Sequence, residues 1–139
     1  MATMTAEARK AFLSGLHVGV LSLNEPGRGP LTAPVWYDYT AQDELVFFIH
    51  ASSRKGRLLA VGTRISLCAQ TETPPYQYVS VEGPVTTITG CDLERDIRPL
   101  ARRYLGQRGG DDYANTVDLS DSVLVRVRPE RWLSADFST

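Results

Sequence analysis

Six apolar segments with the pattern of β-strands divide the sequence, and they limit the possible folds more than any other feature. Turn-forming residues separate most of them, as in antiparallel sheets. Sheet edges this apolar need protection, and closing the sheet into a barrel removes them. We therefore predict a mainly β fold, a six-stranded barrel with two or three short helices. The predicted strands cover residues 17–23, 31–39, 44–50, 63–70, 76–89 and 122–129.

The segments between and around these strands predict the helices and the irregular parts. Pro34 lacks a backbone N–H, so the second strand should be an edge strand or be interrupted there. Gly83 and Pro84 predict a bend or bulge in the fifth strand, and Pro99 a kink in the last helix. Helices are expected at residues 5–14, 53–62 and 91–106, a flexible loop at 106–112, a short helix at Tyr113 capped by Asp111 or Asp112, and a tail at 130–139.

Length and composition exclude several classes of protein. A chain of 139 residues fits one domain, residues 1–139. The net charge of −1 argues against a nucleic-acid-binding protein, and two cysteines and two histidines are too few for a disulfide scaffold or a metal cluster. No signal peptide is apparent, and no segment approaches the ~20 apolar residues of a membrane span. We expect a cytoplasmic protein that binds neither nucleic acid nor membranes.

A basic turn follows the third predicted strand, in the sequence HASSRKGRLL. Ser53 is a suitable N-cap, and Arg54, Lys55 and Arg57 fall in the first turn of the following helix. At this end of a helix each cation is destabilising by about 0.3–1 kcal/mol, because it opposes the helix dipole. An anion bound between the cations would offset this cost. Backbone N–H groups, a serine hydroxyl, a lysine and arginines together favour a phosphate group.

The same turn also allows an interpretation without a ligand. Basic turns after strands are common, and the arginines of this one can pair with Asp38 or Asp43 instead of a bound anion. The local chemistry favours neither interpretation over the other.

The order of segments resembles that of pyridoxamine-phosphate-oxidase-like proteins. The resemblance implies a split β-barrel that binds FMN, assembled as a homodimer with the cofactor in a groove between two protomers. In those proteins, an arginine and a lysine after a strand grip the flavin phosphate. The matching segments are PVWYDY, SRKGRLL, RISLCAQ, YQYVSVEGPVTTI, DDY and the last strand, from about residue 10 to 130.

The second strand departs from the pattern of the true oxidases. Where those enzymes carry an arginine and a lysine that hold FMN, this chain has Ala33 and Asp38, so a pyridoxamine-phosphate oxidase is not expected. PVWY and the strand Y-x-Y-V-x-V-E-G are more similar to an actinobacterial branch, the flavin/deazaflavin oxidoreductases that use coenzyme F420. That resemblance implies hydride transfer from reduced F420 to an enone, a quinone or a tetrapyrrole, and FMN is the alternative cofactor.

The resemblance also assigns cofactor contacts residue by residue, but it assigns no catalytic side chain and no metal ligand. The hydride chemistry would belong to the cofactor. Expected phosphate contacts are Ser53, Arg54, Lys55 and Arg57; ring contacts are Pro34, Val35 and Trp36; a contact near the ribityl chain is His50; and contacts from the neighbouring subunit are Tyr76, Gln77 and Tyr78.

Several of these residues also have ordinary structural interpretations. A strand tryptophan such as Trp36 is often a core or interface anchor, although its polar neighbours Thr32 and Asp38 favour a face that opens onto a cleft or a partner. His50 is equally well interpreted as an ordinary hydrogen-bonded histidine. Cys68 follows the alternation of a buried strand and is expected in the core.

Two further surfaces have alternative interpretations. Tyr76 and Tyr78 share a strand face with Ser80 and Glu82, which is too polar for a barrel interior and is expected at an interface. The arginine-rich helix at residues 95–103 is either a solvated face or a site for the polyglutamate tail of the coenzyme. The contacts of such a tail would be Arg98, Arg102 and Arg103.

Three classes of function stay open on the sequence alone. The first is an F420-dependent reductase. The second is an FMN-binding protein of the same fold, acting as an oxidase-like enzyme or an electron carrier. The third is a module that binds a cofactor or haem without catalysis.

Overall fold

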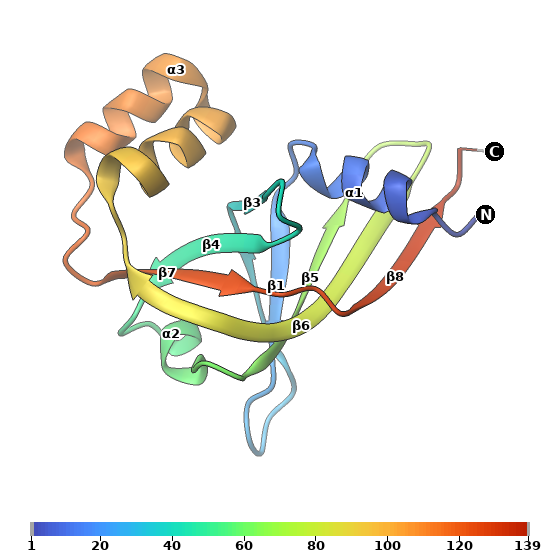
Figure 1. Ribbon diagram of the computed structural model, residues 1–139, viewed down its shortest axis with the longest axis horizontal. Coiled ribbons are helices and arrows are strands. Elements are labelled where there is room, and N and C mark those ends of the chain that lie inside the picture. The colour runs from blue at the N-terminus through green and yellow to red at the C-terminus, as the bar shows by residue number, and fades with distance from the viewer. Residues whose placement is uncertain (1, 139) are drawn as a thin grey trace.

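The computed structural model describes residues 2–138, and its strands form one antiparallel sheet that curls into a split barrel (Figure 1). The order across the sheet is β2-β1-β5-β6-β7-β4-β3, with β8 beside β6. The predicted mainly β, split-barrel fold is confirmed, but these residues form eight strands rather than six. The strands are β1 Gly19–Leu23, β2 Leu31–Val35, β3 Tyr37–Tyr39, β4 Leu45–His50, β5 Arg64–Gln70, β6 Gln77–Gly90, β7 Ser122–Val127 and β8 Arg131–Asp136.

One extra strand arises because the predicted second strand divides at Trp36. Its first part, β2, pairs with β1, whereas its second part, β3, pairs with β4 at the opposite end of the sheet order. The same stretch of chain therefore supplies both edges of the curled sheet. The edge position predicted from Pro34 is confirmed, because β2 pairs on one side only.

The other extra strand is β8, which lies in the segment predicted to be a tail. It pairs with β6 from Gln77 opposite Asp136 to Glu82 opposite Arg131. The bulge in β6 also differs from the prediction. Pairing with β5 is regular through Gly83 and Pro84, and the register shifts between Val85 and Thr87, against β7.

The helices begin close to the predicted positions, but the last two end elsewhere. The N-cap of α1 is Thr5, whose hydroxyl accepts a hydrogen bond from the Ala8 N–H at 3.1 Å. After α2 the chain turns at Ala60–Thr63 instead of continuing to residue 62 as a helix. The helical elements are α1 Ala6–Ser14, α2 Arg54–Leu58, a π-helical turn η1 Leu93–Ile97, and α3 Arg98–Thr116.

The predicted loop at residues 106–112 is wrong, because these residues lie within α3. Gly106 alone leaves the helical conformation, with φ 77° and ψ 173°, and the two segments of α3 fold back beside each other (Figure 1). Asp111 is not a cap: it joins the segments by ion pairs to Arg98 at 2.9 Å and Arg102 at 2.8 Å. Pro99 is the second residue of α3, directly after the π-helical turn η1, and the break in the helix lies at Gly106.

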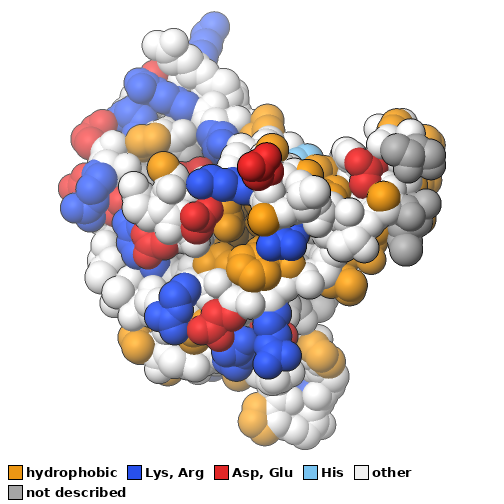
Figure 2. All heavy atoms as spheres, turned by 45° about the vertical axis from the view of Figure 1, so that its right-hand side comes forward, with side chains coloured by type: hydrophobic (Ala, Val, Ile, Leu, Met, Phe, Trp, Pro, Cys, Tyr) orange, Lys and Arg blue, Asp and Glu red, His pale blue; other side chains and the backbone are white. Residues whose placement is uncertain are grey.

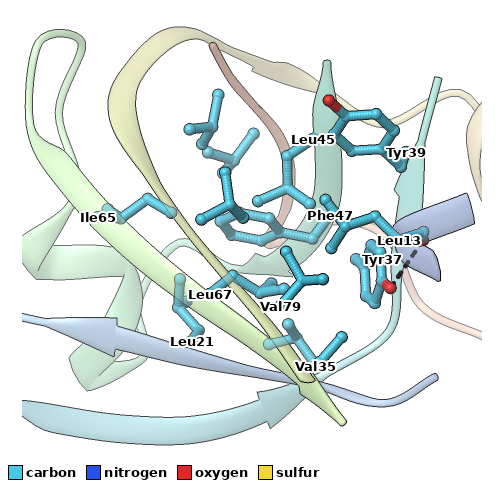
Figure 3. Close-up of a cluster of buried hydrophobic side chains, with 14 of the residues drawn as sticks. Leu13, Leu21, Val35, Tyr37, Tyr39, Leu45, Phe47, Ile65, Leu67 and Val79 are labelled. Atoms are coloured by element: carbon cyan, nitrogen blue, oxygen red, sulfur yellow. Dashed lines mark hydrogen bonds between the residues drawn. The ribbon is translucent and has the colours of Figure 1, made fainter. Parts of the chain in front are cut away.

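The hydrophobic core fills the inside of the curled sheet (Figure 3). Tyr37 is fully buried, and its hydroxyl donates a 2.8 Å hydrogen bond to the Leu13 carbonyl, which ties α1 to β3. Burial raises the pKa of this hydroxyl well above its usual range. The prediction of Cys68 in the core is wrong: the inward side chains of β5 are those of Ile65, Leu67 and Ala69, and Cys68 is half-buried on the opposite face.

Charged side chains are mixed on the surface. Figure 2 shows lysines and arginines interspersed with acidic side chains, and hydrophobic side chains between them near the centre of that face. This face offers no continuous basic surface of the kind that nucleic acids require. No helix within residues 2–138 has both the length and the apolar character needed to cross a membrane.

Candidate functional site

A cleft of about 400 Å³ lies where β2 gives way to β3, beside the end of β4 and the start of α2. We call it the Trp36 cleft. The structure brings together five of the eleven predicted site residues here: Pro34, Val35, Trp36, His50 and Lys55. These residues come from two nearby stretches of the chain, 34–36 and 50–55, whereas Val18 and Tyr113 line the same cleft from distant segments, so the fold itself assembles the cleft.

Tyr104 holds Trp36 at the break between the two strands. The Tyr104 hydroxyl donates to the His17 carbonyl at 2.5 Å and accepts a hydrogen bond from the Tyr37 N–H at 3.0 Å. Its ring stacks on the Trp36 indole, with centroids 5.2 Å apart and planes inclined by 7°. Tyr104 therefore satisfies the backbone where the ladder is interrupted, and it also fixes the orientation of the indole.

Aromatic residues complete the wall of the cleft. The Tyr113 ring, from the second segment of α3, has its centroid 5.3 Å from that of Trp36, and Phe48 on β4 contacts the indole edge-on at 6.4 Å. The aliphatic side chains of Val18 and Ile49 also line the cleft. These lining residues were not among the predicted site residues. The short helix predicted at Tyr113 is part of the longer α3, and Tyr113 lines the cleft from it.

The turn from β4 into α2 is held by backbone and hydroxyl hydrogen bonds. Ser53 is the predicted N-cap: its hydroxyl accepts from the Gly56 N–H at 3.1 Å and donates to the His50 carbonyl at 2.6 Å. A Cβ on Gly56 would lie 2.4 Å from the carbonyl oxygens of His50 and Ala51, so only glycine fits there. Because Ser53 is occupied as a cap, it has no further proton to donate to a ligand.

The three cations after Ser53 differ in their availability. Arg54 forms a bidentate pair with Glu25, with its Nε 3.0 Å from one carboxylate oxygen, and this pairing holds the pKa of Glu25 below its usual range. Arg57 donates through its Nε to the Ser52 carbonyl at 3.0 Å. Lys55 lines the cleft and forms no ion pair within residues 2–138. Arg54 is thus neutralised without a ligand, but by Glu25 and not by Asp38 or Asp43.

The carboxylates that were expected to neutralise this turn pair with other cations. Asp43 pairs with Lys10 at 3.3 Å, and Asp38 lies 3.9 Å from Arg103. Another acidic group stands at the turn instead: Asp121 accepts hydrogen bonds from the hydroxyl and, at 3.2 Å, the N–H of Ser52, which lowers its pKa.

His50 lies at the exposed end of β4, with its side chain on the cleft side. Its imidazole forms no hydrogen bond or ion pair with the described part of the chain. The interpretation of His50 as an ordinary hydrogen-bonded histidine is therefore wrong within residues 2–138, and the ring is free to contact a ligand.

The three residues predicted to contact a ligand in the neighbouring subunit lie away from the cleft. Tyr76, Gln77 and Tyr78 lie at the start of β6, next to β5 and β8, and Tyr76 is 53% exposed. Tyr78, Ser80 and Glu82 face outward between the buried side chains of β6, so the prediction that this face lies outside the barrel is confirmed. The predicted contact of Tyr76, Gln77 and Tyr78 with a ligand in a second subunit stays a prediction.

The arginine-rich segment at residues 95–103 is largely neutralised. Arg98 pairs with Glu94 at 2.8 Å as well as with Asp111, and Arg103 donates to the carbonyls of Ser14 and Gly15 at 2.8 and 2.6 Å. These contacts join the helical elements to one another and to the end of α1. They leave Arg98 and Arg103 poorly suited to bind a polyglutamate tail.

The chemistry open to the Trp36 cleft is binding rather than side-chain catalysis. Its walls are apolar and aromatic, and its polar groups are the ammonium of Lys55 and the imidazole of His50. No group of three or more histidine, cysteine or acidic residues within residues 2–138 is placed to hold a metal ion. The cleft suits a flat, largely apolar ligand with an anionic group at one end.

Comparison with solved structures supports the fold. An F420 reductase matches with a TM-score of 0.71 and 20% identity, over 89% of this chain and 94% of that one. A conserved hypothetical protein from Mycobacterium tuberculosis matches with a TM-score of 0.75 and 25% identity, over 96% and 86% of the two chains. An FAD-binding protein from Mycobacterium smegmatis matches with a TM-score of 0.64 and 13% identity, over 96% and 98%.

The sequence itself gives the assignment to a family. No curated protein matches the chain. The family model described as pyridoxamine 5'-phosphate oxidase matches residues 5–135, nearly the full length, in agreement with the resemblance found in the strand motifs. The chain therefore belongs to the pyridoxamine 5'-phosphate oxidase family.

Proposed function

We propose that this protein is an oxidoreductase that binds the deazaflavin coenzyme F420 in the Trp36 cleft and serves hydride transfer to a small conjugated substrate. The observation that carries the proposal is the position of Lys55. Lys55 lines the same cleft as Trp36 and Pro34, and its ammonium has no carboxylate partner in residues 2–138. A planar ring with a phosphate-bearing side chain matches this combination.

The residues of the cleft fit such a group. A volume of about 400 Å³ is within the range of small-molecule sites, and it accommodates a tricyclic ring while the rest of the coenzyme extends outside. Asp38 stands where the oxidases carry a cation that holds FMN, and a carboxylate beside the cofactor would repel its phosphate. Asp38 does not line this cleft, however, and lies near Arg103. The expected repulsion is therefore absent.

The proposed phosphate contacts are fewer than the sequence predicted. Lys55 is the principal cation, and Arg57 retains the N–H groups of its guanidinium that Ser52 does not use. Arg54 is held by Glu25 and Ser53 caps α2, so both act on the ligand only by stabilising the turn. His50, beside Lys55 in the cleft, remains a proposed contact of the ribityl chain.

The bound deazaflavin would supply the hydride chemistry. The side chains of this protein then have three tasks. Pro34 and Trp36 orient the ring, Phe48 and Tyr113 exclude water from its surroundings, and the remaining space of the cleft holds the substrate near the ring. Enones, quinones and tetrapyrroles are flat and conjugated, and each is compatible with these apolar walls.

A second protomer is part of the proposal. Apolar side chains are exposed on the outer side of the β1–β5–β6–β8 part of the sheet or beside it: Val20 is 38% exposed, Leu133 64% and Phe137 47%. An apolar surface of this kind is typical of protein interfaces. A homodimer that buries it would bring Tyr76, Gln77 and Tyr78 of one protomer towards the open cleft of the other.

The experiment that tests the proposed function is a fluorescence titration of the purified apo protein against F420 and FMN in parallel. We expect tighter binding of F420, and steady oxidation of reduced F420 when an enone or quinone is supplied. Tighter binding of FMN would assign the cleft to a flavin. Binding of F420 without turnover of any such substrate would indicate a cofactor-binding module.

Lys55→Ala tests the observation on which the proposal depends. Loss of one charge-assisted contact should weaken F420 binding by about 1–3 kcal/mol with little effect on folding. Lys10→Ala is the matched control, because Lys10 is the other lysine of the chain and its partner, Asp43, lies outside the cleft. Equal affinities of the two variants would remove Lys55 from the phosphate site.

A further inference from the structure

A second cavity, of about 420 Å³, lies between the outer side of β3, β4 and β7 and the helical elements η1 and α3. It shares no lining residue with the Trp36 cleft. The two cavities are nevertheless neighbours along the same strand faces. Asp38 lines the second cavity two residues after Trp36, and Val46 lines it two residues before Phe48. We call the second cavity the Arg126 cavity.

The floor of the Arg126 cavity is apolar. Val46, Leu100 and Leu124 are 8%, 6% and 3% exposed, and Pro99 lies beside them. These residues come from β4, α3 and β7, so the floor is part of the packed interface between helix and sheet. A floor of this kind favours the hydrocarbon portion of a ligand.

The polar wall of the cavity carries more positive than negative charge, with three arginines and two aspartates. Arg95 and Asp96 neutralise each other through two hydrogen bonds, each 3.0 Å long. Arg103 lies 3.9 Å from the Asp38 carboxylate, beyond hydrogen-bonding distance. Arg103 also donates to the carbonyls of Ser14 and Gly15. Its charge is therefore offset only loosely by a carboxylate, and what it adds to the wall is positive charge.

Arg126 has the greatest capacity to bind a ligand. Its Nη1 forms an ion pair with Glu44, outside the cavity lining, at 3.3 Å. Within residues 2–138, the Nε and Nη2 groups of Arg126 donate no hydrogen bond. A guanidinium with two adjacent N–H directions open matches the two oxygens of a carboxylate.

We propose that the Arg126 cavity is a separate binding site for a small monocarboxylic acid with an apolar body. The carboxylate pairs with Arg126, the charge of Arg103 adds to the attraction, and the ring or branched chain of the acid lies on the floor formed by Val46, Leu100 and Leu124. A bare inorganic anion cannot pack on the apolar floor, and a neutral aromatic compound cannot pair with Arg126. The proposal does not depend on the function of the Trp36 cleft.

Calorimetric titration of the full-length protein with phenylacetate tests this site. Inorganic phosphate and 2-phenylethanol serve as probes that carry only the charge or only the ring. We expect saturable binding of phenylacetate, and much weaker binding of the other two. Arg126→Gln should weaken phenylacetate binding by roughly tenfold to a hundredfold, the effect of losing a hydrogen-bonded charge.

Arg28→Gln is the matched control, because Arg28 is an exposed arginine that also pairs with a single carboxylate, Glu25 at 3.9 Å, and lies outside both cavities. Lys55→Ala tests whether the acid enters the Trp36 cleft instead. We expect both variants to bind phenylacetate as the unaltered protein does. Arg126→Lys keeps the positive charge but lacks the two adjacent N–H groups of a guanidinium, so its affinity for phenylacetate should be intermediate. This variant tests the proposal even if Arg126→Gln does not fold.

Several results would overturn the proposal. Absence of saturable phenylacetate binding would show that the cavity takes no such acid. If phosphate binds as tightly as phenylacetate, the cavity attracts anions by charge alone and the apolar floor has no role. If 2-phenylethanol binds as tightly as phenylacetate, Arg126 has no role in binding. The same loss of affinity in Lys55→Ala as in the Arg126 variants would place the acid in the Trp36 cleft.

Discussion

Single side chains decide how the Trp36 cleft is built. Trp36 interrupts the ladder. The Tyr104 hydroxyl then satisfies the N–H of Tyr37, directly after the interruption, and the carbonyl of His17, just before β1. Tyr37 is fully buried, so its N–H would otherwise lack both water and a protein partner. One hydroxyl thus links the stability of the barrel to the orientation of the indole in the cleft.

Tyr104→Phe should lower the free energy of unfolding by about 1–3 kcal/mol, the usual effect of leaving buried groups without a hydrogen bond. The stacking on Trp36 is kept in this variant. Tyr113→Phe is the control, because it also removes a hydroxyl near Trp36, and that hydroxyl has no hydrogen bond to residues 2–138. Urea unfolding curves measure both. Equal stability of the two variants would show that the Tyr104 hydroxyl does not support the break.

Among the elements, the strands with a clear apolar pattern were predictable, and those that depend on pairing were not. Residues 44–50 and 63–70 became β4 and β5 almost unchanged. In β8, by contrast, Trp132 and Leu133 are both exposed, and the segment is a strand because its backbone pairs with β6. The apolar pattern of a segment indicates which of its side chains will be buried. It does not indicate that its backbone will pair with a strand distant in the sequence.

The helical hairpin shows the same limit for the candidate site. Glycine and aspartate in residues 106–112 are typical of loops, yet the ion pairs of Asp111 with Arg98 and Arg102 hold these residues in α3. The predicted residues Pro34, Val35, Trp36, His50 and Lys55 do line one cleft. Tyr104 and Tyr113 were both expected on helices, but the loop predicted between them gave no indication that these helices fold back together beside Trp36.

Gly106→Ala should destabilise α3 and with it the cover of the Trp36 cleft. The backbone at Gly106 has φ 77° and ψ 173°, a region that essentially only glycine occupies, so a side chain there should cost about 1–3 kcal/mol. Gly29→Ala is the control, since φ at Gly29 is not positive and a Cβ there meets nothing within 4 Å. Urea unfolding that finds both variants equally stable would show that the reversal of α3 does not depend on glycine.

At the scale of the whole molecule, one chain leaves the Trp36 cleft without the contacts expected from Tyr76, Gln77 and Tyr78. These residues lie at the end of β6 that β8 borders, whereas the cleft is built at β2, β3 and β4. The outer face of the sheet exposes apolar side chains that include Leu133, which is opposite Ser80 in the ladder. The proposed homodimer accounts for both features with one interface.

Tyr78→Asp should shift the protein from dimer to monomer in sedimentation velocity and weaken its binding of F420. In a two-fold symmetric interface, the substitution places a charge on each protomer in a surface that must lose water. Thr89→Asp is the control, an exposed position on the same strand whose ladder partner is in β7. An unchanged dimer would place Tyr78 away from the partner. Monomeric protein before any substitution would remove the second protomer from the site, leaving the cofactor to the residues of the Trp36 cleft alone.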